Sequence, residues 1–512
     1  MSERTNRSPT LRLAATDPLV VALRDLTPGD SLGEGGTVAR DPIPRGHKVA
    51  TRAIAAGEPV RKYGQIIGSA STPIAAGDHI HTHNLGFQPT PSDHAIGLGR
   101  HPTEVLPESK AATFQGIVRA DGSVATRNYI GVLTTVNCAS TVAKLIARRF
   151  EQPQALAAFP NVDGVVALTH ALGCAAGETS EANAVLQRTI AGYARHPNFA
   201  AVVVVGLGCE SNGLDRLLEV ERLSPGDRLH RLVIQEEGGT AATVEAGVAR
   251  IRELLPEANR VSRSSVPARH LKLALQCGGS DGFSGITANP ALGVAADLLV
   301  RNGGTAILSE TPEIYGAEHM LLSRAASEEV GRKLLDLIAW WEHYAEVNGD
   351  TLDNNPSPGN KAGGLTTILE KSLGAAAKGG STDLVDVLRY AEPATKPGFV
   401  FMDTPGYDPV SATGQVAGGA NVMCFTTGRG SCFGCKPVPS LKLATNTEMY
   451  RKMAGDMDIN CGSIADGAET VEEVGRAIFD LILRTASGER TRSELLGYGD
   501  EEFAPWHYGA TL

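Results

Sequence analysis

The strongest constraint on the fold is a change of pattern at Phe114. From there onward, largely apolar segments such as "NYIGVLTTVNC", "FAAVVVVGLGC" and "LKLALQC" alternate with helical segments such as "TVAKLIARRF" and "ALGVAADLLVRN". Strands that are apolar throughout are buried on both faces, and strands that alternate with helices form parallel sheets. The chain is therefore predicted to be a multidomain α/β protein over most of its length.

Changes in composition divide the chain further. Short strands separated by Gly and Pro turns, without helical periodicity, predict a small all-β module, and a Pro- and Gly-rich stretch after it predicts a linker. A Pro-, Arg- and Ser-rich stretch near 256–268 predicts another boundary. The predicted parts are a disordered tail (1–14), the all-β module (15–88), the linker (89–113), a central α/β domain (114–265) and a C-terminal Rossmann-like parallel-sheet domain (266–512).

Charge and hydropathy exclude several classes of function. The net charge is −10 and Lys and Arg are not clustered, which disfavours a nucleic-acid partner. The sequence has no apolar run of 18 residues, so no membrane span is expected, and its polar start does not resemble a secretory signal. Cytoplasmic location is the resulting expectation. A glycine-rich dinucleotide fingerprint is also missing, so NAD is not expected.

Four cysteines each close a predicted strand: Cys138, Cys174, Cys209 and Cys277. The carboxyl ends of parallel strands lie along one edge of a sheet, so we expect the four thiols to converge there. Such a group suits a mononuclear metal or an iron–sulfur cluster. The alternative is that each thiol is a small buried hydrophobe. The pair Cys432–Cys435 is a lone C-x-x-C and is weak evidence for metal.

The segment "HIHTHN" carries a second group of possible ligands. His79, His81 and His83 alternate along a predicted strand, so their imidazoles are expected to share one face. Three imidazoles on one face suit a divalent metal. A solvated strand face near a turn is the alternative.

Three polar loops follow predicted strands: "CGGSDGFSGITANP", "NNPSPGNKAGG" and "TTGRGS". Their hydroxyl and amide groups could meet substrate oxygens, and the Lys361 and Arg429 side chains could meet a carboxylate. The loops therefore predict a site for a small polyhydroxylated or anionic molecule, with turn formation alone as the alternative. The candidate substrate-binding residues in these loops are Ser280, Asp281, Ser284, Asn289, Asn360 and Arg429.

Longer motifs carry a family resemblance from about residue 40 to 450. The stretches "PRGHKVA", "HTHN", "ADGSVATRNYIGVLTTVNC", "THALGC", "VVGLGCE", "QCGGSDGFSGITANPALG" and "NPSPGNKAGGLTTILEKSLG" resemble the altronate/galactarate dehydratase family, and the altronate branch most. After "TTGRG" the chain reads "SCFGCKPVPSLKLATN", which departs from a Thr-Pro-Tyr-Gly-like stretch common in that family. We expect this loop to bear on the choice of sugar acid.

The resemblance implies an architecture and an activity. The all-β module is expected to be a β-clip (SAF-like) domain, and the protein is expected to form a homodimer or a higher homo-oligomer. The implied reaction is the dehydration of D-altronate to 2-dehydro-3-deoxy-D-gluconate. The implied cofactor is Fe²⁺, either as a mononuclear ion or in an iron–sulfur cluster, with another divalent ion as the alternative. Dehydration of galactarate, elimination of sulfite from a sulfolactate-type acid, and sugar-acid binding without catalysis are the alternative functions.

The resemblance also suggests roles for particular residues. A base must remove the C2 proton of the acid and an acid must protonate the leaving hydroxyl. The candidates are His170 in "THALGC" and Lys361 in "GNKAGG", with Glu310 and Glu210 as further strand-end carboxylates. His47 in "PRGHKVA" is expected to bind substrate. The expected metal ligands are the four strand-end cysteines first and His81 and His83 second.

Overall fold

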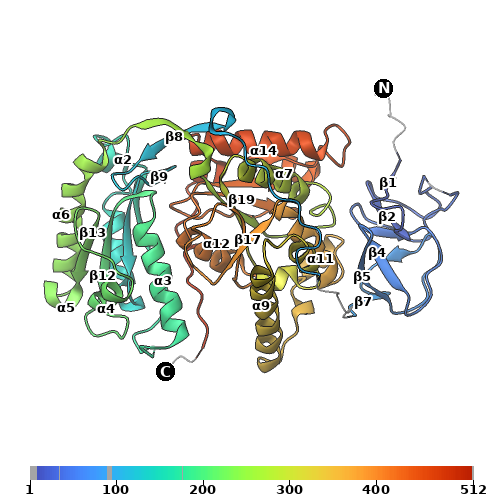
Figure 1. The fold of residues 1–512 in the computed structure, drawn as a ribbon, viewed down its shortest axis with the longest axis horizontal. Coiled ribbons are helices and arrows are strands. Elements are labelled where there is room, and N and C mark those ends of the chain that lie inside the picture. Colours follow the sequence, from blue (N-terminus) through green and yellow to red (C-terminus); the bar gives the residue numbers. More distant parts are fainter. Residues whose placement is uncertain (1–7, 34, 89–94, 176, 510–512) are drawn as a thin grey trace.

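Three domains lie side by side along the long axis of the molecule (Figure 1). The computed structural model describes residues 8–33, 35–88, 95–175 and 177–509. The all-β module lies at one end, the central α/β domain lies at the other, and the C-terminal domain lies between them. The predicted α/β multidomain fold with an N-terminal all-β module is confirmed.

The N-terminal module is built from two antiparallel sheets with strand orders β1-β2-β3-β6 and β4-β5-β7. The strands are β1 (Thr10–Leu11), β2 (Leu19–Ala22), β3 (Lys48–Ala50), β4 (Pro59–Lys62), β5 (Gln65–Ala70), β6 (His79–Ile80) and β7 (Leu85–Gly86). Glycine turns make these short strands possible. At Gly77, for example, φ is +91° and a Cβ atom would lie 2.2 Å from the backbone oxygen of Val38.

The central domain is a four-stranded parallel sheet in the order β11-β10-β12-β13. Its strands are β10 (Tyr129–Thr134), β11 (Gly164–Leu168), β12 (Phe199–Gly206) and β13 (Leu229–Val233). Its helices are α1 (Ser140–Arg148), α2 (Pro153–Leu156), α3 (Glu181–Arg195), α4 (Leu214–Val220), α5 (Ile234–Glu237) and α6 (Thr240–Ala258). Helices α1 and α6 cover one face, and α3 covers the face toward the C-terminal domain (Figure 1).

The C-terminal domain has a seven-stranded, all-parallel sheet in the order β17-β18-β16-β15-β19-β20-β21. The strands are β15 (Lys272–Cys277), β16 (Thr305–Leu308), β17 (Leu384–Leu388), β18 (Gly398–Met402), β19 (Val422–Thr427), β20 (Ser440–Ala444) and β21 (Ile459–Asn460). The chain leaves β15 toward one side of the sheet and returns at β19 on its other side. The crevice between these two strands is the topological switch point, where ligands bind in such sheets.

Helices on both faces bury this sheet. They are α7 (Ala288–Arg301), α8 (His319–Leu322), α9 (Glu328–Val347), α10 (Pro358–Ala362), α11 (Ile368–Ala376), α12 (Asp408–Ala417), α13 (Thr447–Lys452), α14 (Val471–Ala486) and α15 (Arg492–Leu496). Helix α11 matters most for the site, because all nine of its residues are buried.

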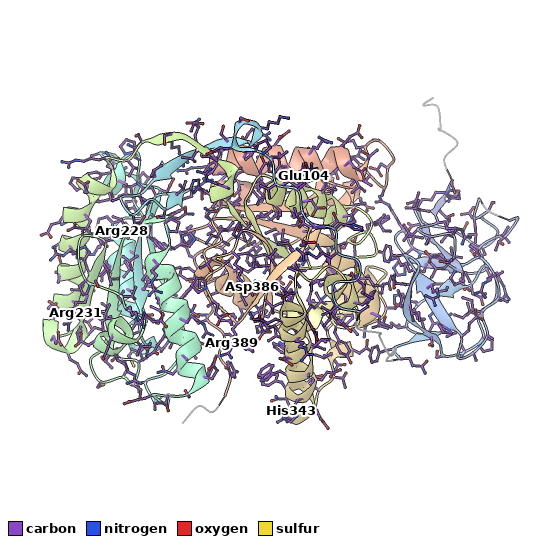
Figure 2. All side chains as sticks on the ribbon, in the orientation of Figure 1. Glu104, Arg228, Arg231, His343, Asp386 and Arg389 are labelled. Atoms are coloured by element: carbon purple, nitrogen blue, oxygen red, sulfur yellow. The ribbon has the colours of Figure 1, made fainter. Side chains whose placement is uncertain are left out.

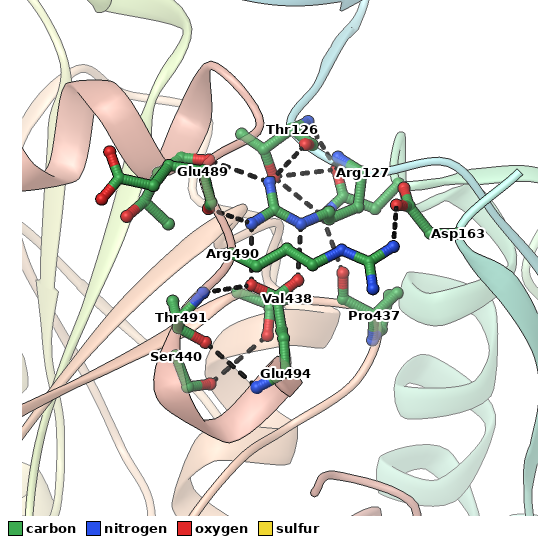
Figure 3. A network of polar contacts seen from close by, with 12 residues as sticks. Thr126, Arg127, Asp163, Pro437, Val438, Ser440, Glu489, Arg490, Thr491 and Glu494 are labelled. Carbon is green, nitrogen blue, oxygen red and sulfur yellow. Dashed lines mark hydrogen bonds and ion pairs between the residues drawn. The ribbon is translucent and has the colours of Figure 1, made fainter. Parts of the chain in front are cut away.

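A buried arginine joins the central and C-terminal domains (Figure 3). Arg127 donates through Nε and Nη2 to the two carboxylate oxygens of Glu494, at 2.6 and 2.8 Å, and through Nη1 to the carbonyl oxygen of Thr485. The forked geometry matches a carboxylate and fixes its partner in direction as well as distance. A small sheet of β8 (Thr113–Val118), β9 (Val124–Ala125) and β14 (Arg263–Pro267) lies beside this joint.

The ends of the predicted parts differ from expectation. Residues 1–7 of the predicted tail lie outside the described residues, but Thr10–Leu11 form β1 because they pair with β2. In the predicted linker, residues 89–94 lie outside the described residues. The rest of it runs along the C-terminal domain, where Gly97 donates to the carbonyl oxygen of Leu322 and Leu106 donates to that of Arg301.

Surface charges of both signs are interspersed. Arg228 pairs with Asp121 on the central domain, and the surface lysines Lys333 and Lys396 pair with the buried Asp386 on the C-terminal domain; Arg228 and Asp386 are labelled in Figure 2. Among the described residues, no helix combines the length and the apolar content that crossing a bilayer requires.

Candidate functional site

The strand-end loops meet at the switch point of the seven-stranded sheet. The loop after β15 and the loop after β19 are joined by backbone hydrogen bonds from Gly428 and Arg429 to the carbonyl oxygen of Gly279, at 3.1 and 2.8 Å. Asp281 is buried below them and accepts hydrogen bonds from Thr445 and Asn446. These contacts fix the floor of a crevice at the point where the fold predicts a ligand.

The predicted substrate-binding residues of this region fall into two groups. Asn289 donates to the carbonyl oxygen of Gly374 and Ser284 donates to Asp281, so these side chains hold loops together. Asn360 likewise donates to the carbonyl oxygen of Ser280. Arg429 is exposed and Lys361 is partly exposed. The first group, the buried amides and hydroxyls, therefore shapes the loops around the crevice. The second group, the cationic side chains of Lys361 and Arg429, is accessible to a ligand.

The β-clip docks directly on this crevice. The backbone of Gly46 lies so close to two glycines of the C-terminal domain that a Cβ atom on Gly282 would lie 2.1 Å from the Gly46 oxygen, and one on Gly364 would lie 2.7 Å from it. Backbones approach this closely only where side chains are missing. Glycine at these two positions therefore permits the contact.

A buried ion triad holds the β-clip in place. Glu370 on α11 accepts from the ammonium groups of Lys48 and Lys62, both at 2.8 Å, and all three side chains are 0% exposed. Lys48 also donates to the carbonyl oxygen of Gly364, at 2.7 Å. Burial alone raises the pKa of Glu370, but the two ammonium groups outweigh it and hold the pKa well below its usual value. One carboxylate thus faces two ammonium groups inside the domain interface, and burial lowers the pKa of Lys48 to about 8.

The same docking brings a cluster of imidazoles to the crevice. The antiparallel register of β3 and β6 pairs Lys48 with Ile80, which sets His47 beside His81. The rings of His47, His79 and His81 have centroids 5.1–5.3 Å apart, and Nδ1 of His47 lies 3.0 Å from Nε2 of His79. His81 donates through Nε2 to the carbonyl oxygen of Lys361, at 2.9 Å. The cluster therefore touches the loop that carries the candidate lysine.

Two details of this cluster differ from the sequence-based prediction. Only His79 lies in a strand, because β6 ends at Ile80 and the Asn84 side chain closes a turn over residues 81–84. His83 is exposed on that turn, with its ring centroid 5.7 Å from that of His79. Burial lowers the pKa of His47 to about 4 and that of His79 to about 3, so both rings are neutral at neutral pH.

A buried layer of charged groups lies at the carboxyl ends of β15 and β16. Lys378 donates to the Cys277 sulfur at 2.8 Å and pairs with Glu310 at 3.7 Å. Lys371, the neighbour of Glu370 on α11, donates to Glu313 at 2.7 Å. Among the described residues, one group of Cys, His, Asp or Glu side chains has its possible metal-binding atoms all within 4.8 Å of one another. It consists of Cys277, Glu310 and Glu313.

Glu310 is the unusual member of that layer. It is 0% exposed, its φ is +72°, and neither of its carboxylate oxygens accepts a hydrogen bond. Burial and the nearby Glu313 carboxylate raise its pKa. The left-handed backbone is a costly conformation for a glutamate. Glu313, Lys371 and Lys378 were not predicted. The charged residues within the mostly small and apolar stretch "ILEKSLGAAAKGG" are a signal that partners of opposite charge lie nearby, because such side chains are rarely buried unpaired.

The four strand-end thiols do not converge, which corrects the prediction from their spacing. Cys138, Cys174 and Cys209 follow β10, β11 and β12 of the central sheet, whereas Cys277 ends β15 of the other sheet. The central sheet ends with β13, and the chain passes through α5, α6 and β14 before it reaches β15. The sequence interval between Cys209 and Cys277 therefore crosses a domain boundary.

His170 and Glu210 belong to the central sheet edge and not to the crevice. His170 is buried with Nε2 on the carbonyl oxygen of Thr134 and Nδ1 accepting from the backbone of Leu172. Glu210 accepts from Thr135 and from the backbone amides of residues 207–209. Both nitrogens of His170 are used by the backbone, so its position does not support the predicted role as a base beside Lys361.

Comparison with known proteins shows which family has this domain architecture. A β-clip that covers the switch point of a parallel sheet, with a second α/β domain beside it, defines a three-domain class of protein. Family models described as the altronate/galactarate dehydratase SAF domain, the D-galactarate dehydratase/altronate hydrolase second domain and the D-galactarate/altronate dehydratase C-terminal domain match residues 8–88, 116–259 and 268–511. The chain belongs to the altronate/galactarate dehydratase family.

Individual relatives agree with that assignment. The chain is 37% identical to the altronate dehydratase of Bacillus subtilis over 98% of its length and 99% of the relative. It is 40% identical to the galactarate dehydratase (L-threo-forming) of Escherichia coli over 88% of its length and 87% of the relative. It is 31% identical to the beta subunit of the (2R)-sulfolactate sulfo-lyase of Chromohalobacter salexigens over 76% of its length and 97% of that subunit.

Proposed function

We propose that this protein is a hydro-lyase that dehydrates D-altronate to 2-dehydro-3-deoxy-D-gluconate in the crevice under the β-clip. The observation that carries the proposal is the meeting of the imidazole cluster of one domain with the Lys361 loop of another, through the contact of His81 with the Lys361 carbonyl. Membership of a dehydratase family and near full-length similarity to an altronate dehydratase support the reaction type and the substrate.

The crevice supplies the groups that such an elimination needs. The substrate carboxylate is proposed to pair with Arg429, which is exposed at the rim. Proton transfer at C2 and at the leaving hydroxyl is assigned to Lys361, whose loop contacts the imidazole cluster. The buried Asp281 and Asn360 side chains hold the loops that place these groups.

A divalent ion, Fe²⁺ first, is proposed between His47 and His79, because Nε2 of His81 already donates to the carbonyl oxygen of Lys361. Two nitrogens bound at about 2.1 Å and at right angles to one ion lie about 3 Å apart. The 3.0 Å separation of the His47 and His79 nitrogens fits that requirement, and both rings are neutral. When bound, such an ion polarises the acid and makes the C2 proton easier to remove. Neither His81 nor His83 completes a set with this pair whose ligand atoms all lie within 4.8 Å of one another. Among the described residues the buried side chains of Cys277, Glu310 and Glu313 do form such a set, and they are the second candidate site for the ion.

A 2-keto-acid assay tests the function. The protein is purified without oxygen, supplied with ferrous iron, and given altronate, galactarate, mannonate and gulonate in turn. Turnover of altronate well above that of the other three is expected. Preference for galactarate is the second candidate, favoured by the 40% identity to a galactarate dehydratase. Sulfite release from sulfolactate without turnover of any sugar acid would contradict both.

Two further properties go with this proposal. We expect the enzyme to act in the cytoplasm, where reducing conditions keep its eight free cysteines as thiols. We also expect a homodimer or a larger homo-oligomer, which light scattering on the purified protein measures directly.

A further inference from the structure

The carboxyl edge of the central sheet carries three thiols that the proposed reaction does not use. Cys138, Cys174 and Cys209 are all exposed and free. They follow three neighbouring strands, with β10 between β11 and β12. Adjacent strands are about 4.8 Å apart, so the three loops start close together. We call this group the thiol edge.

Backbone hydrogen bonds connect the loops that follow β10, β11 and β12. The amide of Ser211 donates to the carbonyl oxygen of Cys174, at 3.0 Å, which connects the loops of β11 and β12 across the strand between them. The amide of Asn137 donates to the carbonyl oxygen of Leu172, at 2.9 Å, which brings in the loop of Cys138. The three loops that carry the thiols are therefore held together by backbone hydrogen bonds.

Buried polar side chains fix the loops from below. Glu210 accepts from the amides of Leu207, Gly208 and Cys209, and Thr135 donates to it at 2.6 Å. The site is thus preorganised and not a chance meeting of surface cysteines.

The three sulfurs have contacts and spacing that point to a ligand type. Gln235 donates to the Cys209 sulfur at 3.5 Å, the kind of contact that tunes a metal-bound thiolate. Among the described residues, the three sulfurs do not form a group within 4.8 Å of one another. Thiolates on a single tetrahedral ion lie about 3.8 Å apart. A polynuclear cluster binds each thiolate through a different iron and accepts a wider separation.

We propose that the thiol edge binds an iron–sulfur cluster through Cys138, Cys174 and Cys209, separate from the crevice under the β-clip. The edge belongs to the central domain, which lies at the opposite end of the molecule from the β-clip (Figure 1). His170 is a positioning residue there, because its ring holds the turn at Leu172 and its backbone oxygen accepts from Asn137. The proposal does not depend on which acid the crevice binds.

The test measures cluster content rather than turnover. Full-length protein is reconstituted without oxygen with ferrous iron and sulfide, then assayed for iron, acid-labile sulfide and visible charge-transfer absorption. We expect iron and labile sulfide in matched amounts in the unaltered protein. Cys174→Ser should lower the labile sulfide at least tenfold. Cys432→Ser is the control, because Cys432 is exposed but lies outside the thiol edge, and it should change nothing.

Several outcomes separate the possibilities. Unaltered protein without labile sulfide after reconstitution overturns the proposal, and so does labile sulfide retained in the Cys138→Ser, Cys174→Ser, Cys209→Ser triple variant. Zinc in place of iron, lost on Cys174→Ser, also overturns it. Circular dichroism and electron paramagnetic resonance of the variants distinguish loss of the cluster from loss of the fold. Labile sulfide in a protein that turns over no sugar acid supports the cluster while contradicting the proposed function.

Discussion

Two sheet edges of this molecule carry reactive side chains, and they are built in opposite ways. In the C-terminal domain the edge is covered: the β-clip closes over it, and Lys48, Lys62 and Glu370 are 0% exposed. In the central domain the edge is open, and its thiols are exposed. The same topological rule marks both edges as ligand sites. Burial and donor type differ between the edges, and on that basis we propose a hydroxylated acid as the ligand of the covered edge and an iron–sulfur cluster as the ligand of the open edge.

The largest expected effect comes from removing the charge that seals the covered edge. Glu370→Gln leaves two ammonium groups buried without the carboxylate charge that they share, and breaking a buried ion pair in this way typically costs about 3–5 kcal/mol. We expect a large fall in the free energy of unfolding and loss of turnover, because the imidazole cluster loses its place on the Lys361 loop. Chemical denaturation and the 2-keto-acid assay measure the two effects.

Acid sensitivity provides the control for this variant. The folded pKa of Glu370 lies below its ordinary value of 4.5, so its stabilisation is complete above that pH and is lost as the pH falls below it. The variant should lack this part of the acid-induced loss. Glu58→Gln, which breaks a surface pair with Arg52, should lower the stability far less than Glu370→Gln does, because water screens the pair. Equal costs for the two variants would mean that the triad does not seal the edge.

The second effect separates the two edges by function. His79→Ala removes one member of the imidazole cluster and should lower turnover about 100-fold or more. It should leave labile sulfide at the thiol edge unchanged, because His79 lies on the β-clip. His343→Ala, on the exposed side of α9, is the control (Figure 2). Loss of labile sulfide in His79→Ala would show that the two edges form one site.

The contrast also shows which features the sequence could reveal. Strand and helix periodicity is local, so the α/β body and the all-β module followed from it. The pairing of strands is not local. His47 joins His79 and His81 because β3 pairs with β6, and Cys277 leaves the other thiols because a domain boundary intervenes. The spacing of residues along the chain predicts neither the strand pairing nor the domain boundary, because both depend on which buried faces pack together.

The third prediction tests how closely the β-clip must pack against the covered edge of the C-terminal sheet. Gly282→Ala places a methyl group 2.1 Å from the Gly46 oxygen, so the β-clip must move away, at a cost of about 1–3 kcal/mol. We expect a lower melting temperature and a raised KM. Gly173→Ala is the matched change at the open edge, where a Cβ atom meets no other atom within 4 Å. A comparable loss in Gly173→Ala would remove the distinction between a tight and an open edge.

The smallest effect concerns a carboxylate near the buried layer of the covered edge. Burial and the nearby Glu313 raise the pKa of Asp408 to about 7, above its ordinary value of 3.8. Its contribution to stability is therefore full below pH 3.8 and is lost as the pH rises through 7. Asp408→Asn should weaken this dependence by on the order of 1 kcal/mol, since the side chain is partly exposed and water screens it.

Denaturation of Asp408→Asn and of the unaltered protein at several pH values between 4 and 7 measures the difference. Asp215→Asn on the central domain is the control, because Asp215 pairs with Arg231 at an exposed surface and 78% of its side chain is exposed. The control should follow the unaltered protein at every pH. If the free energy of unfolding changes with pH in the same way for Asp408→Asn and the unaltered protein, then Asp408 behaves like a surface carboxylate. The effect of burial on the pKa of carboxylates at the covered edge would then not extend to Asp408.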